Sequence, residues 1–145
     1  LQDMPEYHFH VVGGGKLQNL VDAQLGTLPN VSLHNPVFGI SRYLASFDYM
    51  LMPSEFEGLP LMSVEASSAG LPVVCSDCKG LNETVSADWQ LTAHGNSHEE
   101  YMQIFRNVIP HADRAALAQT ARRFVREHFS VEKMQAGYEQ VYRQE

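Results

Sequence analysis

This sequence lacks several features that would mark a membrane, secreted or nucleic-acid-binding protein. No apolar run approaches the about 20 residues that a membrane-spanning helix needs. Basic residues are scarce, with 10 Lys and Arg against 17 Asp and Glu, and the net charge is −7. This balance disfavours binding to nucleic acid or to a membrane through a polybasic surface. Two cysteines are too few for a secreted disulfide framework, so a soluble globular protein in a reducing compartment is predicted.

Recognisable metal and nucleophile motifs are also missing. The sequence contains no Asp-x-Asp pair, and none of its 7 histidines lies near a serine in a nucleophile elbow. Cys75 and Cys78 form a single C-x-x-C without a second ligand pair, so we expect two unlinked thiols. His34, at an expected strand end, is the only histidine near a candidate site, and packing or loop hydrogen bonding is favoured for it. We therefore expect no metal and no cofactor.

Strand-like and helix-like segments alternate along much of the chain. Strands are expected at 7–12, 31–34, 49–52 (buried), 73–75 and 90–92, and helices at 16–25, 40–47, 61–69, 99–108, 114–127 and about 130–143. The alternating part is typical of an α/β domain with a Rossmann-like parallel sheet and helices on both faces. Asp113 and Ser130 are expected to be helix N-caps. At 145 residues the chain is predicted to be one domain, 1–145.

A glycine turn follows the first expected strand. It reads Gly13-Gly14-Gly15-Lys16, but Leu17 replaces the Ser or Thr of a Walker loop and Gln18 replaces the third glycine of a dinucleotide fingerprint. We interpret it as a tight strand-to-helix turn in which Gly14 lines a nucleotide crevice. A dinucleotide-dependent oxidoreductase is disfavoured by the incomplete glycine fingerprint. The lack of an acidic residue at the end of strand 31–34 also disfavours it.

The segment 53–74 carries the strongest functional signal. It places two carboxylates, Glu57 and Glu65, on either side of a turn that opens a helix, with Pro60 as the expected first helical residue. The unpaired amides and positive dipole of a helix start suit an anion, and a carboxylate on such a helix suits sugar or ribose hydroxyls. The rival interpretation is a structural ion pair. Because the turn leaves the carboxyl end of strand 49–52, a nucleotide-sugar site is favoured.

The ordered motifs of this chain resemble those of a known family. The signature Pro53-Ser-Glu-Phe-Glu-Gly-Leu-Pro-Leu-Met-Ser-Val-Glu-Ala is similar to that of family 4 retaining glycosyltransferases, which have the GT-B fold. The flanking segments resemble the same family in order and spacing: His10-Val-Val-Gly-Gly-Gly15, Asn35-Pro-Val-Phe-Gly39, Phe47-Asp-Tyr-Met-Leu-Met-Pro-Ser54, Lys79-Gly-Leu-Asn-Glu-Thr84 and His128-Phe-Ser-Val131. The resemblance covers nearly the whole chain and implies the C-terminal, donor-binding half of a GT-B enzyme.

The resemblance assigns roles to individual residues. The catalytic residue would be Glu57, which would hold hydroxyls of the donor sugar. The donor-binding residues would be Gly58, Leu59, Pro60 and Leu61 for the sugar and diphosphate, Glu65 for the ribose, and Val37 and Phe38 beside the base. The implied reaction moves a sugar from a nucleotide-sugar to a glycan, lipid-linked or small-molecule acceptor with retention. The nucleotide-sugar is then a substrate, and the resemblance implies no metal held by this domain.

The chain also departs from the family pattern. The first strand and helix of the donor domain, with the Arg and Lys that neutralise the diphosphate, are missing, and so is the acceptor-binding N-terminal domain. We therefore expect a fragment of a longer two-domain enzyme that is inactive alone. Acceptor contacts and any membrane contact would lie in the missing half, and the location would be cytoplasmic or peripheral at the inner face of the cell membrane. The alternative is a non-catalytic nucleotide-sugar-binding or scaffolding module of the same fold.

Overall fold

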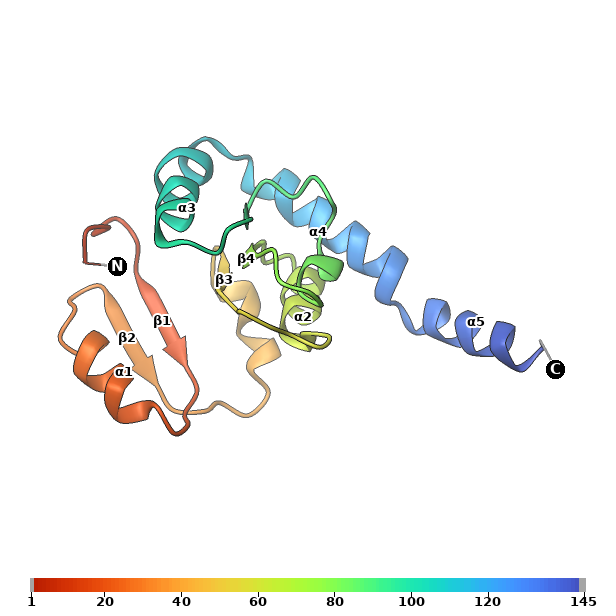
Figure 1. Cartoon of the computed structure of the whole chain (residues 1–145), viewed down its shortest axis with the longest axis horizontal. Helices are drawn as coiled ribbons and strands as arrows, with labels where there is room; N and C mark the ends of the chain where they lie inside the picture. The colour runs from red at the N-terminus through yellow and green to blue at the C-terminus, as the bar shows by residue number, and fades with distance from the viewer. Residues whose placement is uncertain (1, 144–145) are drawn as a thin grey trace. The chain divides into compact units, whose positions relative to one another are not determined.

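The computed structural model describes residues 2–143 of the chain. Contacts divide the chain into two compact units, Leu1–Ile40 and Ser41–Glu145, and each unit is described by itself. Figure 1 shows the strands and helices that alternate along both units. The predicted α/β class is confirmed, because every strand pairing in the described residues is parallel.

The first unit is a strand–helix–strand motif. Strand β1 (Phe9–Val12) runs parallel to strand β2 (Val31–His34), and helix α1 (Gln18–Leu25) connects them. Alternate residues of β1 are half-buried and exposed, as expected for a strand with one covered face. The buried Asn30 donates to the carbonyl oxygens of Met4 (3.0 Å) and Tyr7 (3.2 Å), so the start of the chain is tied to the start of β2.

The second unit is built on a three-stranded parallel sheet of order β3-β4-β5. Its strands are β3 (Met50–Met52), β4 (Val73–Ser76) and β5 (Thr92–Ala93). The central strand β4 is buried throughout, which explains its unbroken apolar start. The prediction that 49–52 is a buried strand is wrong, because β3 is an edge strand of this sheet and Leu51 keeps 36% of its surface exposed.

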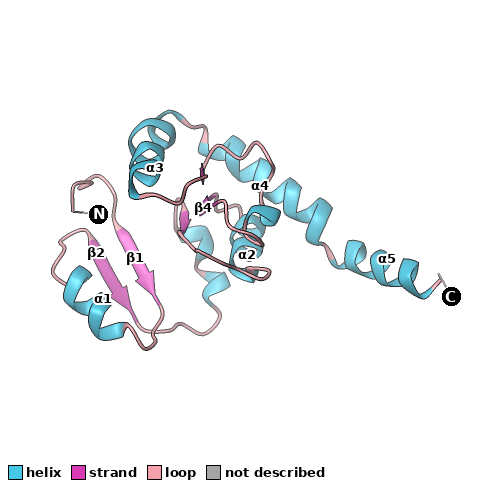
Figure 2. Cartoon of the chain, viewed as in Figure 1, coloured by secondary structure: helices cyan, strands magenta, loops and turns pink. Residues whose placement is uncertain are grey.

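Four α-helices belong to the second unit (Figure 2): α2 (Leu61–Ala69), α3 (His98–Gln103), α4 (Arg114–Phe129) and α5 (Val131–Tyr142). Helix α2 contacts α4, and its buried residues are Ser63, Ala66 and Ser67. Both predicted N-caps are confirmed. Asp113 accepts from the amides of the first turn of α4 at 3.0 and 3.1 Å, and Ser130 accepts from the amide of Lys133 at 3.2 Å.

Two predicted helices are shorter or tighter in the structure. The segment expected to be a helix over 40–47 forms two 3₁₀ turns, Ile40–Arg42 and Leu44–Ser46, in place of a continuous α-helix. The helix expected over 99–108 ends as an α-helix at Gln103 and continues as a π-helical turn, Ile104–Val108. Pro110 follows in a last 3₁₀ turn and, without an amide hydrogen, cannot extend the helix.

Candidate functional site

The loop between β3 and α2 is hydrogen-bonded to residues at the carboxyl ends of the other two strands of the second unit. Glu57 is half-buried, and its Oε1 accepts a hydrogen bond from Ser54 Oγ at 2.8 Å. The carbonyl oxygen of Ser54 accepts from Ser76 Oγ at the end of β4 (2.5 Å) and from Asn96 Nδ2 beyond β5 (3.4 Å). Residues after all three strands therefore hold the start of this loop.

The backbone carbonyl groups at the C-terminus of helix α2 have hydrogen-bond donors, whereas the first backbone amides at its N-terminus have no acceptor among the described residues. Gly70 ends the helix in a left-handed conformation (φ 78°), and Arg122 Nη2 donates to the carbonyl oxygen of Ala69 at 2.7 Å. At the other end, no side chain caps the helix, and the described residues provide no acceptor for the amides of Leu61 and Met62. These amides are available to an anion.

Pro60 is the N-cap of α2 and not its first helical residue. Its ψ of 94° is extended, so Pro60 lies just outside the helix, which begins at Leu61 as the range 61–69 predicts. Pro60 is buried, while Gly58, Leu59 and Leu61 are exposed. A Cβ at Gly58 would meet nothing within 4 Å, so the backbone at that position faces open space. A ligand can therefore approach this part of the loop closely.

Glu65 lies on the exposed side of α2. The buried residues of the helix are on its other side, and Glu65 forms no hydrogen bond or ion pair with any residue that the structure describes. The rival interpretation of the two glutamates, a structural ion pair, therefore finds no support. A solvated carboxylate needs no protein partner, and it remains free to accept hydroxyl groups of a ligand.

A second loop packs on the first. Gly80 has φ 88°, and a Cβ there would overlap the carbonyl oxygens of Glu57 and Gly58 and come within 2.9 Å of the Glu57 carbonyl carbon. Only glycine permits this backbone-to-backbone contact. The segment 79–84 belongs to the sequence resemblance, but the requirement for glycine at position 80 is visible only in the structure.

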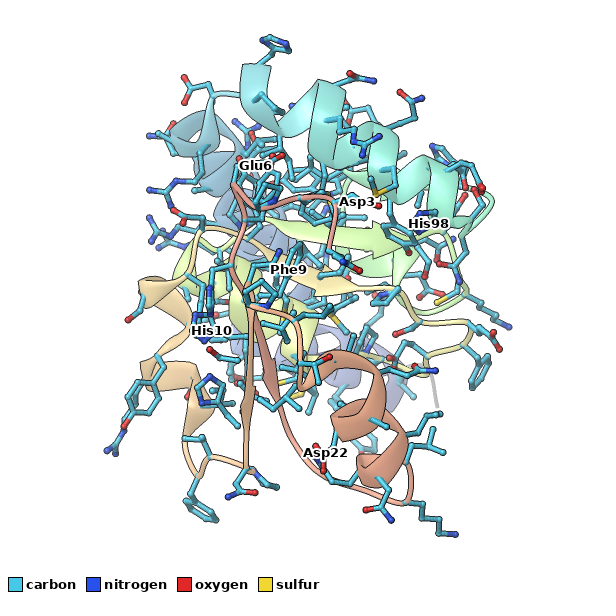
Figure 3. All side chains as sticks on the ribbon, turned by 90° about the vertical axis from the view of Figure 1, so that its left-hand side faces the viewer. Asp3, Glu6, Phe9, His10, Asp22 and His98 are labelled. Carbon is cyan, nitrogen blue, oxygen red and sulfur yellow. The ribbon has the colours of Figure 1, made fainter. Side chains whose placement is uncertain are left out.

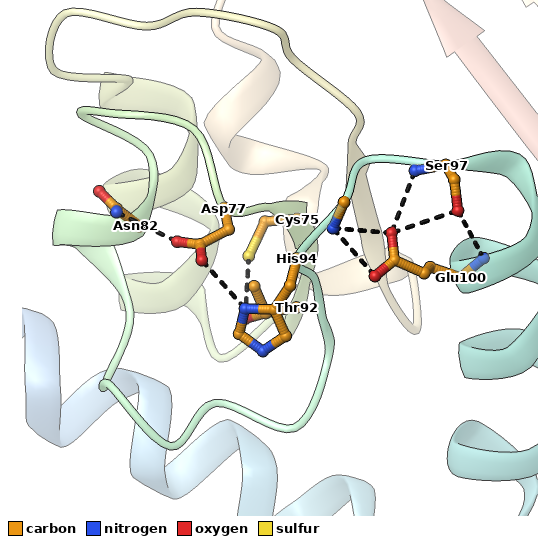
Figure 4. A network of polar contacts seen from close by, with 8 residues as sticks. Cys75, Asp77, Asn82, Thr92, His94, Ser97 and Glu100 are labelled. Carbon is orange, nitrogen blue, oxygen red and sulfur yellow. Dashed lines mark hydrogen bonds and ion pairs between the residues drawn. The ribbon is translucent and has the colours of Figure 1, made fainter.

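Asp77 joins the carboxyl ends of β4 and β5 (Figure 4). Its carboxylate lies 3.0 Å from His94 Nδ1 and accepts from Asn82 Nδ2 at 3.1 Å. These two hydrogen bonds, that of His94 first, lower the pKa of Asp77. Sequence reasoning missed His94 and singled out His34. The available signal was that Asp77 and His94 both follow strands of one parallel sheet, whose carboxyl ends share an edge.

The segment after β5 is capped by its own residues. Glu100 accepts from the amides of Gly95 (2.9 and 2.8 Å) and Ser97 (3.1 Å), and Ser97 Oγ accepts from the Glu100 amide at 3.3 Å, which completes a capping box at the start of α3. The bond from Gly95, followed by that from Ser97, lowers the pKa of Glu100. The Glu100 carboxylate therefore caps the N-terminus of α3.

The two cysteines are free, as the sequence predicts. Burial raises the pKa of Cys75 to about 11, so its thiol is not an available nucleophile at neutral pH. Cys78 is half-buried in the loop after β4. Within residues 2–143, no three His, Cys, Asp or Glu side chains are arranged to hold a metal ion.

The remaining predicted site residues belong to the first unit. Gly14, Val37 and Phe38 are exposed, and a hollow of about 380 Å³ lies against the glycine turn. Beside it, His34 Nε2 is 2.9 Å from Nδ1 of His10, which lies on β1 (Figure 3). His34 therefore forms a hydrogen bond, but its partner lies on the neighbouring strand and not in a loop. Gly14 lies close to Pro36, the residue before Val37, because a Cβ at Gly14 would be 3.5 Å from the Pro36 ring.

Known proteins resemble this chain over most of its length. A family model described as glycosyl transferases group 1 matches residues 1–127. The O-antigen biosynthesis glycosyltransferase WbnH of Escherichia coli is 30% identical over 84 residues, which cover 58% of this chain and 25% of that protein. The UDP-Gal:alpha-D-GlcNAc-diphosphoundecaprenol alpha-1,3-galactosyltransferase of Escherichia coli is 34% identical over 83 residues, which cover 54% of this chain and 21% of that protein.

The fold is shared with a solved structure. A crystal structure of the GtfA/B complex matches 96% of this chain and 30% of its own chain, with a TM-score of 0.78 at 18% identity. The alignments with the two curated relatives span about a quarter of their length (25% and 21%). Among residues 2–143, no helix combines the length and the apolar character needed to cross a membrane.

Proposed function

Because this chain belongs to the group 1 glycosyl transferases, we propose that it is the donor-binding half of an enzyme that transfers a sugar from a nucleotide-sugar with retention of configuration. One observation carries the proposal: α2 begins with open amides between two carboxylates that form no ion pair with the described residues. Phosphate and hydroxyl recognition are thus available within a single segment.

The proposed roles follow from the positions of these groups. The diphosphate would bind the amides of Leu61 and Met62, where the positive end of the helix dipole stabilises the charge that develops as the diphosphate leaves. Glu65, farther along the helix, would accept the ribose hydroxyls. Glu57, held by Ser54 Oγ at 2.8 Å, would accept hydroxyls of the donor sugar. No side chain in this scheme is a covalent nucleophile, so the segment acts by positioning and charge stabilisation.

The first unit would supply the surface for the base. In this proposal Val37 and Phe38 contact the base, and Gly14 in the glycine turn lines the nucleotide crevice, because each is exposed and available to a ligand. The acceptor would bind mainly to parts of the enzyme outside this chain. We therefore propose that the chain alone does not transfer sugar. We further propose that the enzyme is cytoplasmic, with membrane contact only through its other half.

Ligand-observed NMR with uridine, guanosine and adenosine diphosphates tests the donor site. The galactosyltransferase relative is named for UDP-Gal, so the uridine series is the first probe. We expect one base series to bind, and Glu65→Ala to weaken that binding about tenfold, since a hydrogen bond to a charged group contributes about 1.5–3 kcal/mol. The control is Glu127→Ala, which removes an exposed carboxylate from α4. Equal binding by both variants and the parent chain would contradict the proposed role of Glu65.

A further inference from the structure

The loop between β3 and α2, residues 53–60 and here called the donor loop, packs against a second loop whose two ends are joined. Residues 77–82 follow β4, and Gly80 in this segment leaves no room for a Cβ against the carbonyl groups of Glu57 and Gly58. Asn82 Nδ2 donates to Asp77 Oδ1 at 3.1 Å, and the Asn82 amide donates to the carbonyl oxygen of Cys78 at 3.0 Å, so two hydrogen bonds close the segment on itself. We therefore expect a displacement of loop 77–82 to shift the backbone of Glu57 and Gly58, which Gly80 contacts.

His94 holds that closed loop from the neighbouring strand. It follows β5, and its Nδ1 lies 3.0 Å from Asp77 Oδ2, the oxygen that Asn82 does not use. The amide of Asp77 donates to the carbonyl oxygen of Ala93 at 3.2 Å, so side chain and backbone both join this loop to the end of β5. In the close-up view the imidazole and Asn82 approach the carboxylate from different sides (Figure 4).

We propose that His94 is a positioning residue for the donor-sugar side of the site. Through Asp77 it holds loop 77–82, and through Gly80 that loop sets the position of Glu57 and Gly58. Among the described residues His94 bonds to Asp77 and forms no hydrogen bond or ion pair with Glu57 or Gly58, so it acts only through this chain of contacts. This inference rests on the proposed function in taking Glu57 as the group that meets the sugar.

Helix α2 has supports that do not pass through His94. It contacts α4, its C-terminus is held by Gly70 and Arg122, and Ser63 in its first turn shares a hydrogen bond with Thr84. Loss of His94 therefore loosens Glu57 and Gly58 while the amides of Leu61 and Met62 stay in place. Recognition of the sugar should weaken, and recognition of the nucleoside diphosphate should not. A general loss of folding would weaken both together.

The first test needs no ligand. In the full chain, ¹⁵N order parameters of Glu57 and Gly58 should lie near the rigid value of about 0.85 and fall toward about 0.6 in His94→Ala. The values across α2 should not change. His94→Asn places an amide donor near Asp77 and should restore the rigid values. Mobile Glu57 and Gly58 amides in the parent chain, or unchanged values in His94→Ala, would overturn the inference.

The second test separates this inference from the proposed function. Dissociation constants are measured for UDP and for UDP-galactose; guanosine or adenosine pairs replace them if the base survey selects another base. We expect His94→Ala to weaken the nucleotide-sugar about threefold to tenfold, the effect of one disturbed hydrogen bond, and to leave the diphosphate unchanged. Binding with an unchanged ratio overturns the role of His94 alone. No nucleotide bound by the parent chain overturns the proposed function and this inference with it.

Glycine substitutions give a matched pair for the same measurements. Gly80→Ala and Gly70→Ala each force a side chain into a left-handed conformation, with φ of 88° and 78°. Only Gly80 touches the donor loop, whereas Gly70 lies against Arg122. We expect Gly80→Ala to mobilise Glu57 and Gly58 and Gly70→Ala to leave them rigid. Equal mobility in the two variants would show that general strain, and not loop support, controls the site.

Discussion

Ser63 on α2 and Thr84 share a buried hydrogen bond of 2.7 Å between their hydroxyl oxygens. Thr84 Oγ1 also donates to the carbonyl oxygen of Leu81 at 2.7 Å, so its single proton is used and Ser63 must donate to Thr84. This chain of hydrogen bonds links the helix of the candidate site to Leu81 of loop 77–82, inside the core of the second unit.

Replacing Thr84 with valine should destabilise the second unit. Thr84→Val keeps the side-chain shape but leaves the Ser63 hydroxyl without an acceptor and the Leu81 carbonyl without that donor. Buried unsatisfied groups cost about 1–3 kcal/mol each. Urea unfolding followed by fluorescence of Trp89, the only tryptophan and a buried residue of this unit, measures the change. In Ser63→Ala, Thr84 keeps its bond to Leu81, so the free energy of unfolding should fall by less than in Thr84→Val. An equal or larger fall in Ser63→Ala would contradict the prediction.

The two thiols should differ sharply in reactivity. Burial raises the pKa of Cys75 to about 11, and its sulfur lies beneath the surface, whereas Cys78 is half-buried. Native labelling with iodoacetamide at pH 7.5, read by mass spectrometry, should modify Cys78 before Cys75. Labelling in urea should modify both. Native modification of Cys75 at the rate of Cys78 would show that β4 is more accessible than its burial indicates.

Acid should weaken the contact between β4 and β5. The hydrogen bonds from His94 and Asn82 lower the pKa of Asp77 below its ordinary value, so the folded state holds this proton less tightly than the unfolded state. The stabilisation is therefore present above the ordinary carboxyl pKa and is lost as pH falls through the folded pKa. Unfolding of the parent chain and of Asp77→Asn, followed by Trp89 fluorescence, should differ near neutral pH. The difference should shrink at low pH; a constant difference would exclude this titration.

The first unit should lose stability at a higher pH than the contact between β4 and β5. Burial, followed by the neighbouring His8 and His34, lowers the pKa of His10. The unit is therefore most stable above the ordinary histidine pKa, and stability is lost as pH falls below it. NMR signals of β1 and β2 should broaden or shift on mild acidification, and less so in His10→Gln. A titration that is the same in both proteins would contradict the role of His10.

Local signals explain where the sequence predictions succeed. Helix 61–69 is correct to the residue, because Pro60 and Gly70 bound it with conformations that a helix interior disfavours. Asp113 and Ser130 act as N-caps through hydrogen bonds to amides only two or three residues farther along the chain. These features depend on neighbours in the chain, and a sequence displays such neighbours directly.

The failures depend on distant neighbours. The strand at 49–52 looks buried from its apolar residues, yet β3 is an edge strand of its sheet. His94 resembles any exposed histidine until β4 and β5 pair and place it beside Asp77. Gly80 is one glycine among 10, and its need for a bare backbone arises from Glu57 and Gly58 in another loop.

The sequence by itself determined the α/β class and the family through an ordered set of motifs. It also determined the two glutamates around a helix start, because spacing and helix-terminal chemistry are local properties. Only the tertiary structure decided that Glu65 is free, that Pro60 caps α2, and that Gly80 and Asp77 support the donor loop from β4 and β5. The physical reason is that burial, hydrogen-bond partners and backbone clearance are set by contacts between segments far apart in the chain.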